Sequence, residues 1–185
     1  MSYNVFTKPT DAFKEAIERP NVLKGVVIVI LAGILLSIMG YLATGLVSIA
    51  PIIILVNIIQ WLVLAIVLWF FEFMLAPKKK GFKATGIGMR EILTMTGKQW
   101  LIILVAGIIF IIGLFGMSNR IVVMIMLIII AVLIVIWFIS LYKMVKVTLE
   151  CTTGKAIVAW ILLIILQSLL TGFVLNLISL PISLI

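Results

Sequence analysis

Few side chains in this sequence are able to hold a ligand or move a proton, and most of them interrupt long apolar stretches. Asn57, Gln60 and Glu72 share one such stretch, and at 100° per residue they fall within a helical wedge of about 120°. Polar groups are costly in a bilayer, so we expect all three to face the interior of a helix bundle. Gln167 lies near the middle of another stretch, where we expect its amide to bond Gln60 or Asn57. The alternative is that these amides only fasten helices together.

Glu72 is the acidic residue of these apolar stretches, and it lies a few residues before Pro77. Two roles are open for it. Its carboxyl group could carry a proton or bind a cationic ligand, which would make the polar wedge part of a transport path. Alternatively, the carboxylate reaches the membrane interface and pairs with one of three nearby lysines, Lys78, Lys79 or Lys98.

A dense basic cluster follows Glu72 directly. It consists of Lys78, Lys79, Lys80 and Lys83. Each lysine near a membrane surface is attracted to anionic lipid by about 1 kcal/mol. We therefore take this cluster as a candidate face for lipid or for a partner protein. The alternative is that it serves only to orient the chain in the membrane.

The remaining composition argues against catalysis. The chain has no histidine, a single cysteine (Cys151) and six dispersed acidic residues. Zinc and copper sites need several His, Cys or carboxylate ligands that converge, and histidine-based nucleophile pairs are excluded. We expect no catalytic residue, no metal site and no cofactor, and hence no enzyme. Cys151 is expected to be an unmodified thiol, with reversible acylation as the alternative.

The elements that position these residues are predicted to be membrane-spanning helices. The chain is 65% hydrophobic and 11% charged, with a mean hydropathy of +1.45. A bilayer is crossed by about 20 apolar residues in a helix. Five segments meet this length: Gly25–Ala50, Ile52–Ala76, Trp100–Gly116, Ile121–Tyr142 and Ala156–Ile178. We expect an all-α polytopic membrane protein, with a cytoplasmic amphipathic lead-in (residues 1–24) before a five-helix transmembrane domain (residues 25–185).

The basic residues alternate with these spans. Of the 14 Lys and Arg residues, all but Arg120 precede the first span or lie between the second and third or the fourth and fifth spans. Short loops rich in Lys and Arg stay on the cytoplasmic side. This distribution predicts a cytoplasmic N-terminus and an external C-terminus. It also accounts for the net charge of +8 without a nucleic-acid partner.

Two shorter segments show amphipathic periodicity. In Thr10–Arg19, Thr10 is the expected N-cap, and Phe13, Ala16 and Ile17 share a face that we expect to lie on the membrane surface. Gly88–Thr96 predicts a second interfacial helix, which leads into Trp100.

Small residues and a repeated triplet give further expectations. Gly33, Ser37, Gly40, Thr44 and Ser48 recur at helical spacing in the first span, which favours close helix packing within one chain over a dimer contact. Pro51 is expected to separate the first two spans in a tight hairpin. The triplets Thr96-Gly97-Lys98 and Thr153-Gly154-Lys155 each predict a turn and a snorkelling lysine at a cytoplasmic helix entrance.

Several motifs carry a family resemblance. They are Lys8-Pro9, Phe13, Ile17 and Arg19-Pro20 before the first span, Trp137-Phe138-Ile139-Ser140-Leu141-Tyr142-Lys143 at the end of the fourth, and Thr153-Gly154-Lys155-Ala156 before the last. With five spans, the chain resembles the Yip family (Ypt- or Rab-interacting proteins), most closely its short prokaryotic members. The Asp-Leu-Tyr-Gly-Pro segment of eukaryotic members is absent, and Thr96-Gly97 replaces a Gly-Tyr often found ahead of the third span. The resemblance therefore implies a non-enzymatic, membrane-organising role without implying a Rab partner.

Two functions of different classes follow. In the first, the chain is a multi-pass adaptor or scaffold that acts through its cytoplasmic face, in contact with membrane lipid, including anionic lipid, and with another membrane protein. Homo-oligomers are compatible with this role. In the second, the chain is a small carrier or a transporter subunit with a polar path near Glu72. The expected location is the cell membrane, or early secretory membranes if the source is eukaryotic.

Overall fold

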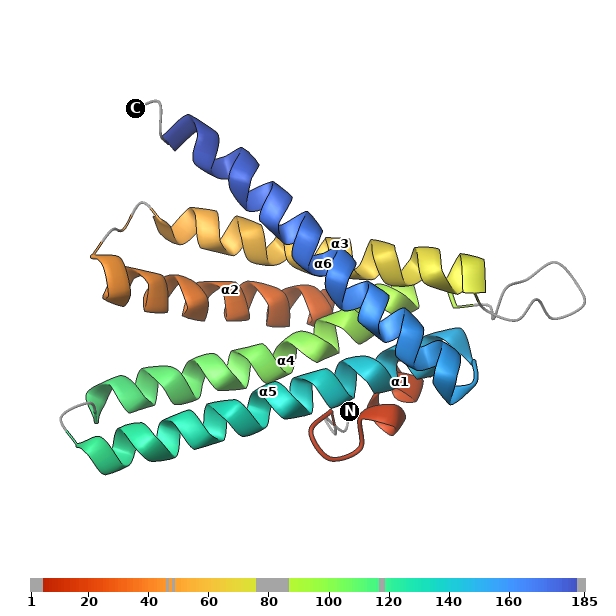
Figure 1. Cartoon of the computed structure of the whole chain (residues 1–185), viewed down its shortest axis with the longest axis horizontal. Coiled ribbons are helices and arrows are strands. Elements are labelled where there is room, and N and C mark those ends of the chain that lie inside the picture. Colours follow the sequence, from red (N-terminus) through yellow and green to blue (C-terminus); the bar gives the residue numbers. More distant parts are fainter. Residues whose placement is uncertain (1–4, 46, 48, 76–86, 117–118, 183–185) are drawn as a thin grey trace, which may run out of the picture.

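The computed structural model describes residues 5–45, 47, 49–75, 87–116 and 119–182, and every regular element in these ranges is a helix. The helices are α1 (Pro9–Glu18), α2 (Val22–Thr44), α3 (Ile49–Leu75), α4 (Met89–Phe115), α5 (Arg120–Leu149) and α6 (Thr153–Ile182) (Figure 1). Helices α2 to α6 are each long and apolar enough to cross a membrane. The predicted all-α fold with five spans is thus confirmed.

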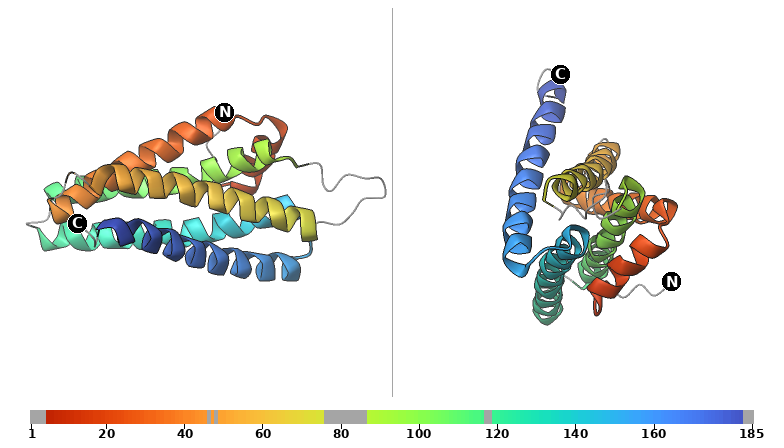
Figure 2. Two further views of the ribbon diagram at one scale, coloured as in Figure 1. Left: turned by 90° about the horizontal axis from the view of Figure 1, so that it is seen from above. Right: turned by 90° about the vertical axis from the view of Figure 1, so that its right-hand side faces the viewer.

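The long helices run lengthwise through the molecule, and α6 crosses the others obliquely on one side (Figures 1 and 2). One end of the bundle holds α1, the starts of α2, α4 and α6, and the ends of α3 and α5. The other end holds the ends of α2, α4 and α6 and the starts of α3 and α5 (Figure 1). We call the first the basic end because it carries the described Lys and Arg residues other than Arg120: Lys8, Lys14, Arg19, Lys24, Arg90, Lys98, Lys143, Lys146 and Lys155.

The hydrophobic core lies in the half of the bundle toward the basic end. The largest fully buried side chains come from α1, the second half of α3, the first half of α4, the last turns of α5 and the first half of α6. They are Phe13, Leu64, Leu68, Ile92, Met95, Gln99, Trp100, Ile102, Leu141, Met144, Leu149 and Leu163. Toward the other end, large apolar side chains are exposed, as at Phe115 and Ile121. Lipid tails would cover such a surface in a membrane.

Helix α4 contacts four other helices, α1, α2, α3 and α5. Its closest approach is to α2, where Gly97 lies against Gly25. A Cβ atom added to Gly97 would run into the backbone of Gly25, so only glycine permits this approach. Small residues allow such backbone contact between membrane helices.

The start of α4 corrects two predictions. The segment expected to form a separate interfacial helix, Gly88–Thr96, and the span expected to begin at Trp100 are one unbroken helix from Met89. No proline interrupts the segment, and its residues from Thr94 to Trp100 are buried. The triplet Thr96-Gly97-Lys98 is therefore a buried part of α4 and not a turn. The second triplet does open a helix, since α6 begins at Thr153.

Other helix ends differ from the prediction as well. Helix α2 ends at Thr44, before the predicted Ala50, because Gly45 adopts a left-handed conformation (φ 73°) that terminates it. Pro51 lies in the first turn of α3, where a missing N–H costs nothing, and not between the helices. Helix α5 was predicted to end at Tyr142 but continues to Leu149. Its last two residues are buried.

The amphipathic segment near the N-terminus forms α1, but its apolar face does not lie on the membrane surface. Phe13 and Ala16 are completely buried, and α1 contacts α4 and α5. The helix begins at Pro9, and the preceding Lys8 makes no side-chain cap, so Thr10 is not the N-cap. The apolar face of α1, which we expected lipid to cover, is therefore covered by the other helices of the bundle.

The stripe of small residues in α2 packs against α3, as predicted for contact within one chain. Gly33 lies against Ile54 and Asn57. The hydroxyl group of Ser37 donates to the carbonyl oxygen of Gly33 at 2.7 Å and is 2.9 Å from that of Ala50. The side chains of Thr44 and Ser48 fall outside the described part of the structure.

Candidate functional site

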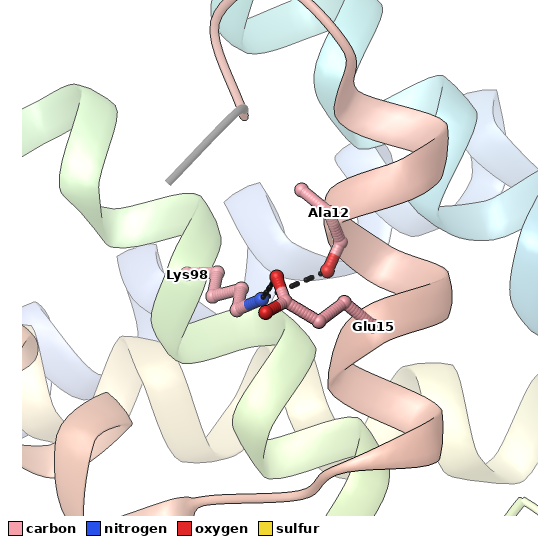
Figure 3. Close-up of polar contacts among 3 residues, drawn as sticks. All are labelled: Ala12, Glu15 and Lys98. Carbon is pink, nitrogen blue, oxygen red and sulfur yellow. Dashed lines mark hydrogen bonds and ion pairs between the residues drawn. The ribbon is translucent and has the colours of Figure 1, made fainter. Parts of the chain in front are cut away.

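Three consecutive residues of α4, Lys98, Gln99 and Trp100, connect this helix to three others. Successive side chains on a helix are 100° apart, so the three diverge in different directions. Lys98 points to α1, where its ammonium group donates to the carbonyl oxygen of Ala12 at 2.9 Å and to the carboxylate of Glu15 at 3.0 Å (Figure 3). The Lys98 side chain is 7% exposed and that of Glu15 is 26% exposed. This contact fixes α1 to the bundle.

Gln99 connects α4 to α5 and is completely buried. Its amide nitrogen donates to the carbonyl oxygen of Trp137 at 2.9 Å. Its amide oxygen accepts a hydrogen bond from the hydroxyl group of Ser140 at 2.7 Å. Both hydrogen-bonding atoms of the Gln99 amide therefore have partners, which is the condition for burying an amide without a large cost.

Trp100 connects α4 to α3 and, through Asn57, to α2. Its indole N–H donates to the amide oxygen of Asn57 at 2.9 Å. The amide nitrogen of Asn57 donates in turn to the carbonyl oxygen of Val29 at 2.7 Å. Asn57 is buried, as we predicted, but its partners are Trp100 and Val29. The expected bond from Asn57 to Gln167 is wrong.

Gln60 and Gln167, the two glutamines of the predicted polar path, take no part in these hydrogen bonds. Gln60 is half-buried and lies near Leu170 and Thr171 of α6. Gln167 is also half-buried. Within the described residues, no hydrogen bond links Gln60 to Gln167. The predicted wedge therefore divides, with Asn57 bonded to α2 and α4 and Gln60 beside α6.

Glu72 lies in the last turn of α3, and only 3% of it is exposed. Of its three expected partners, Lys98 instead bonds Ala12 and Glu15. Lys78 and Lys79 fall outside the described residues, as do Lys80 and Lys83. The expectation that this basic cluster forms a lipid or partner face is therefore not addressed by the structure.

A charged groove lies between α1 and α5 at the basic end, with a volume of about 550 Å³. Lys14 and Glu18 line it from α1, Lys143 and Lys146 line it from α5, and Glu150 lines it from the C-cap of α5. Both signs of charge therefore face the same space. We call this space the α1–α5 groove.

Cys151 lies beside this region, in the connection between α5 and α6. Burial raises the pKa of its thiol, against the opposing effects of a backbone hydrogen bond and of the ammonium groups of Lys155 and Lys146. The thiolate is the reactive form of cysteine. Its environment therefore lowers the reactivity of Cys151 at neutral pH.

Glu15, Lys98, Gln99 and Ser140 were not identified as a connected set from the sequence. Reading Gly88–Thr96 as a separate interfacial helix placed Lys98 at a helix entrance, facing water. A usable signal was present, because no helix-breaking proline lies between Met89 and Trp100. A continuous helix would have put Lys98 and Gln99 inside the bundle, where polar side chains need partners.

Comparison of the chain with protein-family models, with curated proteins and with solved structures finds no match. In the described ranges, no three His, Cys, Asp or Glu side chains gather closely enough to hold a metal ion. What these ranges do contain is a set of buried polar contacts between helices and one charged groove at the basic end.

Proposed function

We propose that this chain is a non-enzymatic, Yip-type membrane protein that works as an adaptor or membrane organiser through its basic end. The observation that carries this proposal is the attachment of α1 by Lys98. It holds a charged helix in a fixed position across α4 and α5, which gives a partner a defined surface. The Yip-type assignment rests on the motif resemblance alone.

The use of the buried polar groups also favours an adaptor over a carrier. Asn57, Gln99 and Lys98 are all engaged in bonds between helices. A carrier needs polar groups that remain available to its substrate along a path across the bilayer. Groups already paired between helices are better suited to holding the bundle together.

We further propose that the basic end faces the cytoplasm and that the protein resides in the cell membrane, or in early secretory membranes of a eukaryote. The asymmetric distribution of Lys and Arg supports this orientation. The expected partners are membrane lipid and another membrane protein that binds the basic end. A homo-oligomer is compatible with this role.

Affinity purification in a mild detergent through a C-terminal tag tests the adaptor role. We expect a stoichiometric membrane protein to copurify with the wild type, identified by mass spectrometry. Lys98→Met should release α1 and lose this partner, whereas Lys8→Met, an exposed change on the same segment, should retain it. Purification of the wild type without any other protein, whether as a monomer or as a homo-oligomer alone, would contradict the proposal.

The burial of Glu72 supports the second candidate, a transport component. An ionisable residue inside a membrane span is often functional. Proteoliposomes with an entrapped pH-sensitive dye measure whether the wild type conducts protons. A proton flux that Glu72→Gln abolishes, with the protein still folded, would favour a carrier over the adaptor.

A further inference from the structure

The α1–α5 groove is built from regularly spaced charges on two neighbouring helices. On α1, Lys14 and Glu18 are one helical turn apart. On α5, Lys143 and Lys146 are about one turn apart, and Glu150 follows at the C-cap of this helix. Since Lys98 attaches α1 to α4, the two walls of the groove are held in position.

Aromatic side chains near this groove are of the kind that lies at the depth of lipid headgroups. The rings of Tyr142 and Trp160 are 6.3 Å apart, and Trp160 also contacts Phe138 at 6.2 Å. Tyr and Trp gather where the hydrocarbon core meets the headgroups. Lys143 follows Tyr142 directly, with its ammonium 5.7 Å from the ring centroid, and the groove extends from there toward the basic end.

The charges in the groove select the chemistry of a ligand. Three ammonium groups, from Lys14, Lys143 and Lys146, attract a phosphate. Two carboxylates, from Glu18 and Glu150, repel a purely anionic ligand and attract a cation. A headgroup with a phosphate and a primary ammonium group satisfies both sets. A quaternary ammonium group satisfies the carboxylates less well, because it has no N–H to donate.

We propose that the α1–α5 groove binds the headgroup of a phosphoethanolamine lipid. The phosphate lies among the lysines, the ammonium group lies at the glutamates, and the acyl chains follow the apolar surface of α5. This site goes beyond the adaptor role and requires no protein partner. It also differs from the cluster around Lys78 in selecting a zwitterionic lipid over an anionic one.

Native mass spectrometry of the purified chain in detergent tests this site. Phosphatidylethanolamine, phosphatidylcholine and phosphatidylglycerol with identical acyl chains are added in turn, and the bound lipid is measured. We expect the wild type to retain phosphatidylethanolamine in preference to the other two. No partner protein is present, so failure of the adaptor proposal leaves this result unaffected.

Variants of α1 assign the binding to the groove. Lys14→Gln should weaken phosphatidylethanolamine binding about fivefold, as expected for one lysine near a phosphate. Glu18→Gln should remove the preference for phosphatidylethanolamine over phosphatidylcholine. Lys8→Gln and Asp11→Asn each remove a charge of the matching sign at a position outside the groove, and both should bind lipid as the wild type does. All four positions are exposed, so folding should be retained, and thermal unfolding without lipid verifies this.

Three results would overturn the proposal. The first is equal or tighter binding of phosphatidylglycerol by the wild type, which would indicate general attraction of anionic lipid. The second is the same loss of binding in Lys8→Gln as in Lys14→Gln. The third is full competition by soluble glycerophosphoethanolamine at the concentration of the lipid, which would make the ligand a free headgroup and not a membrane lipid.

Discussion

Asn57 joins three helices through two hydrogen bonds, and its replacement tests what such a bond contributes in this bundle. Asn57→Leu keeps the branched shape of the side chain, although leucine is larger, and leaves the indole N–H of Trp100 buried without its acceptor. Bonds between membrane helices contribute about 0.6 kcal/mol on average and up to about 1.7 kcal/mol. We expect a loss of about 1 kcal/mol, seen as a decrease in Tm of roughly 2–4 °C by circular dichroism in detergent.

A double-mutant cycle separates this bond from the packing around it. Trp100→Phe removes the donor and keeps an aromatic ring in place. If the bond matters, Asn57→Leu should cost less in the Trp100→Phe background than in the wild type. Strictly additive decreases in Tm would show that the two side chains do not interact energetically.

Cys151 offers a pH-dependent prediction. Because burial raises the pKa of its thiol, the folded chain holds this proton more tightly than the unfolded chain. The resulting contribution to stability is present below the usual thiol pKa and is lost as the pH rises through the raised value. We expect maleimide to label native Cys151 more slowly than the SDS-unfolded chain, with a rate profile displaced to higher pH. Coincident pH profiles would contradict the effect of burial.

At this scale the sequence predicts the burial of some polar residues but not their partners. The position of Asn57 on its helix predicts burial, and Asn57 is buried. Its partners, Val29 and Trp100, depend on how α2, α3 and α4 rotate against one another. Nothing in the local sequence encodes that rotation, because aliphatic side chains surround each helix of this chain almost evenly.

At the scale of elements, the crossing of α2 and α4 depends on Gly97. Gly97→Ala places a methyl group against the backbone of Gly25, which cannot yield as a side chain can. The helices must separate, and overpacking of this kind costs about 1–3 kcal/mol. We expect Tm to decrease by several degrees, at roughly 2–4 °C per kcal/mol, in thermal unfolding followed by circular dichroism.

Gly154 provides the matched control, since it also lies in a helix but has open space where a Cβ would be. Alanine has the higher helix propensity, so Gly154→Ala should leave Tm unchanged or raise it slightly. Equal decreases for the two variants would mean that the Gly25–Gly97 contact is not what limits stability.

The attachment of α1 gives a second prediction for an element. Lys98→Met removes both the bond to Ala12 and the ion pair with Glu15, while Glu15→Gln removes the ion pair and keeps the bond from Lys98 to Ala12. We expect amide hydrogen exchange in α1 to accelerate in both variants, and more in Lys98→Met. Each 1.4 kcal/mol of lost attachment accelerates exchange about tenfold.

Exchange in α6 serves as the internal reference for this measurement, because α6 makes no contact with α1 among the described helices. Uniform acceleration in α1 and α6 would indicate global destabilisation. Unchanged exchange in α1 would show that Phe13 and Ala16 alone hold the helix.

The helices that the sequence predicts well are those with clear end signals. Pro20 separates α1 from α2, and the predicted Thr10–Arg19 differs from α1 by one residue at each end. The start of α4 was misplaced because an amphipathic segment has the same periodicity whether lipid or protein covers its apolar face. Only the neighbouring helices decide between the two, and here much of the segment is buried within the bundle.

For the whole molecule, composition is enough to predict the number of spans but not their arrangement. The five helices, with a mean hydropathy of 2.3 to 3.5, are long and apolar enough to cross a bilayer by length and composition alone. The arrangement instead depends on a few exceptions to that composition, such as Gly97, Lys98, Gln99 and Asn57. Each is one residue in a long apolar helix, so average hydropathy conceals it. The α1–α5 groove was missed for the same reason, since it forms only when α1 docks on α5.

The orientation of the bundle is the final prediction, and the single native cysteine makes it testable. In a Cys151→Ser background, Thr152→Cys places a thiol at the basic end, and Arg120→Cys places one at the opposite end. Both positions are exposed, so reactivity depends on the side of the membrane. The positive-inside rule predicts that a membrane-impermeant maleimide labels Arg120→Cys on intact cells and labels Thr152→Cys only after permeabilisation. The reverse pattern would put the basic end outside, and the α1–α5 groove would then face the external leaflet.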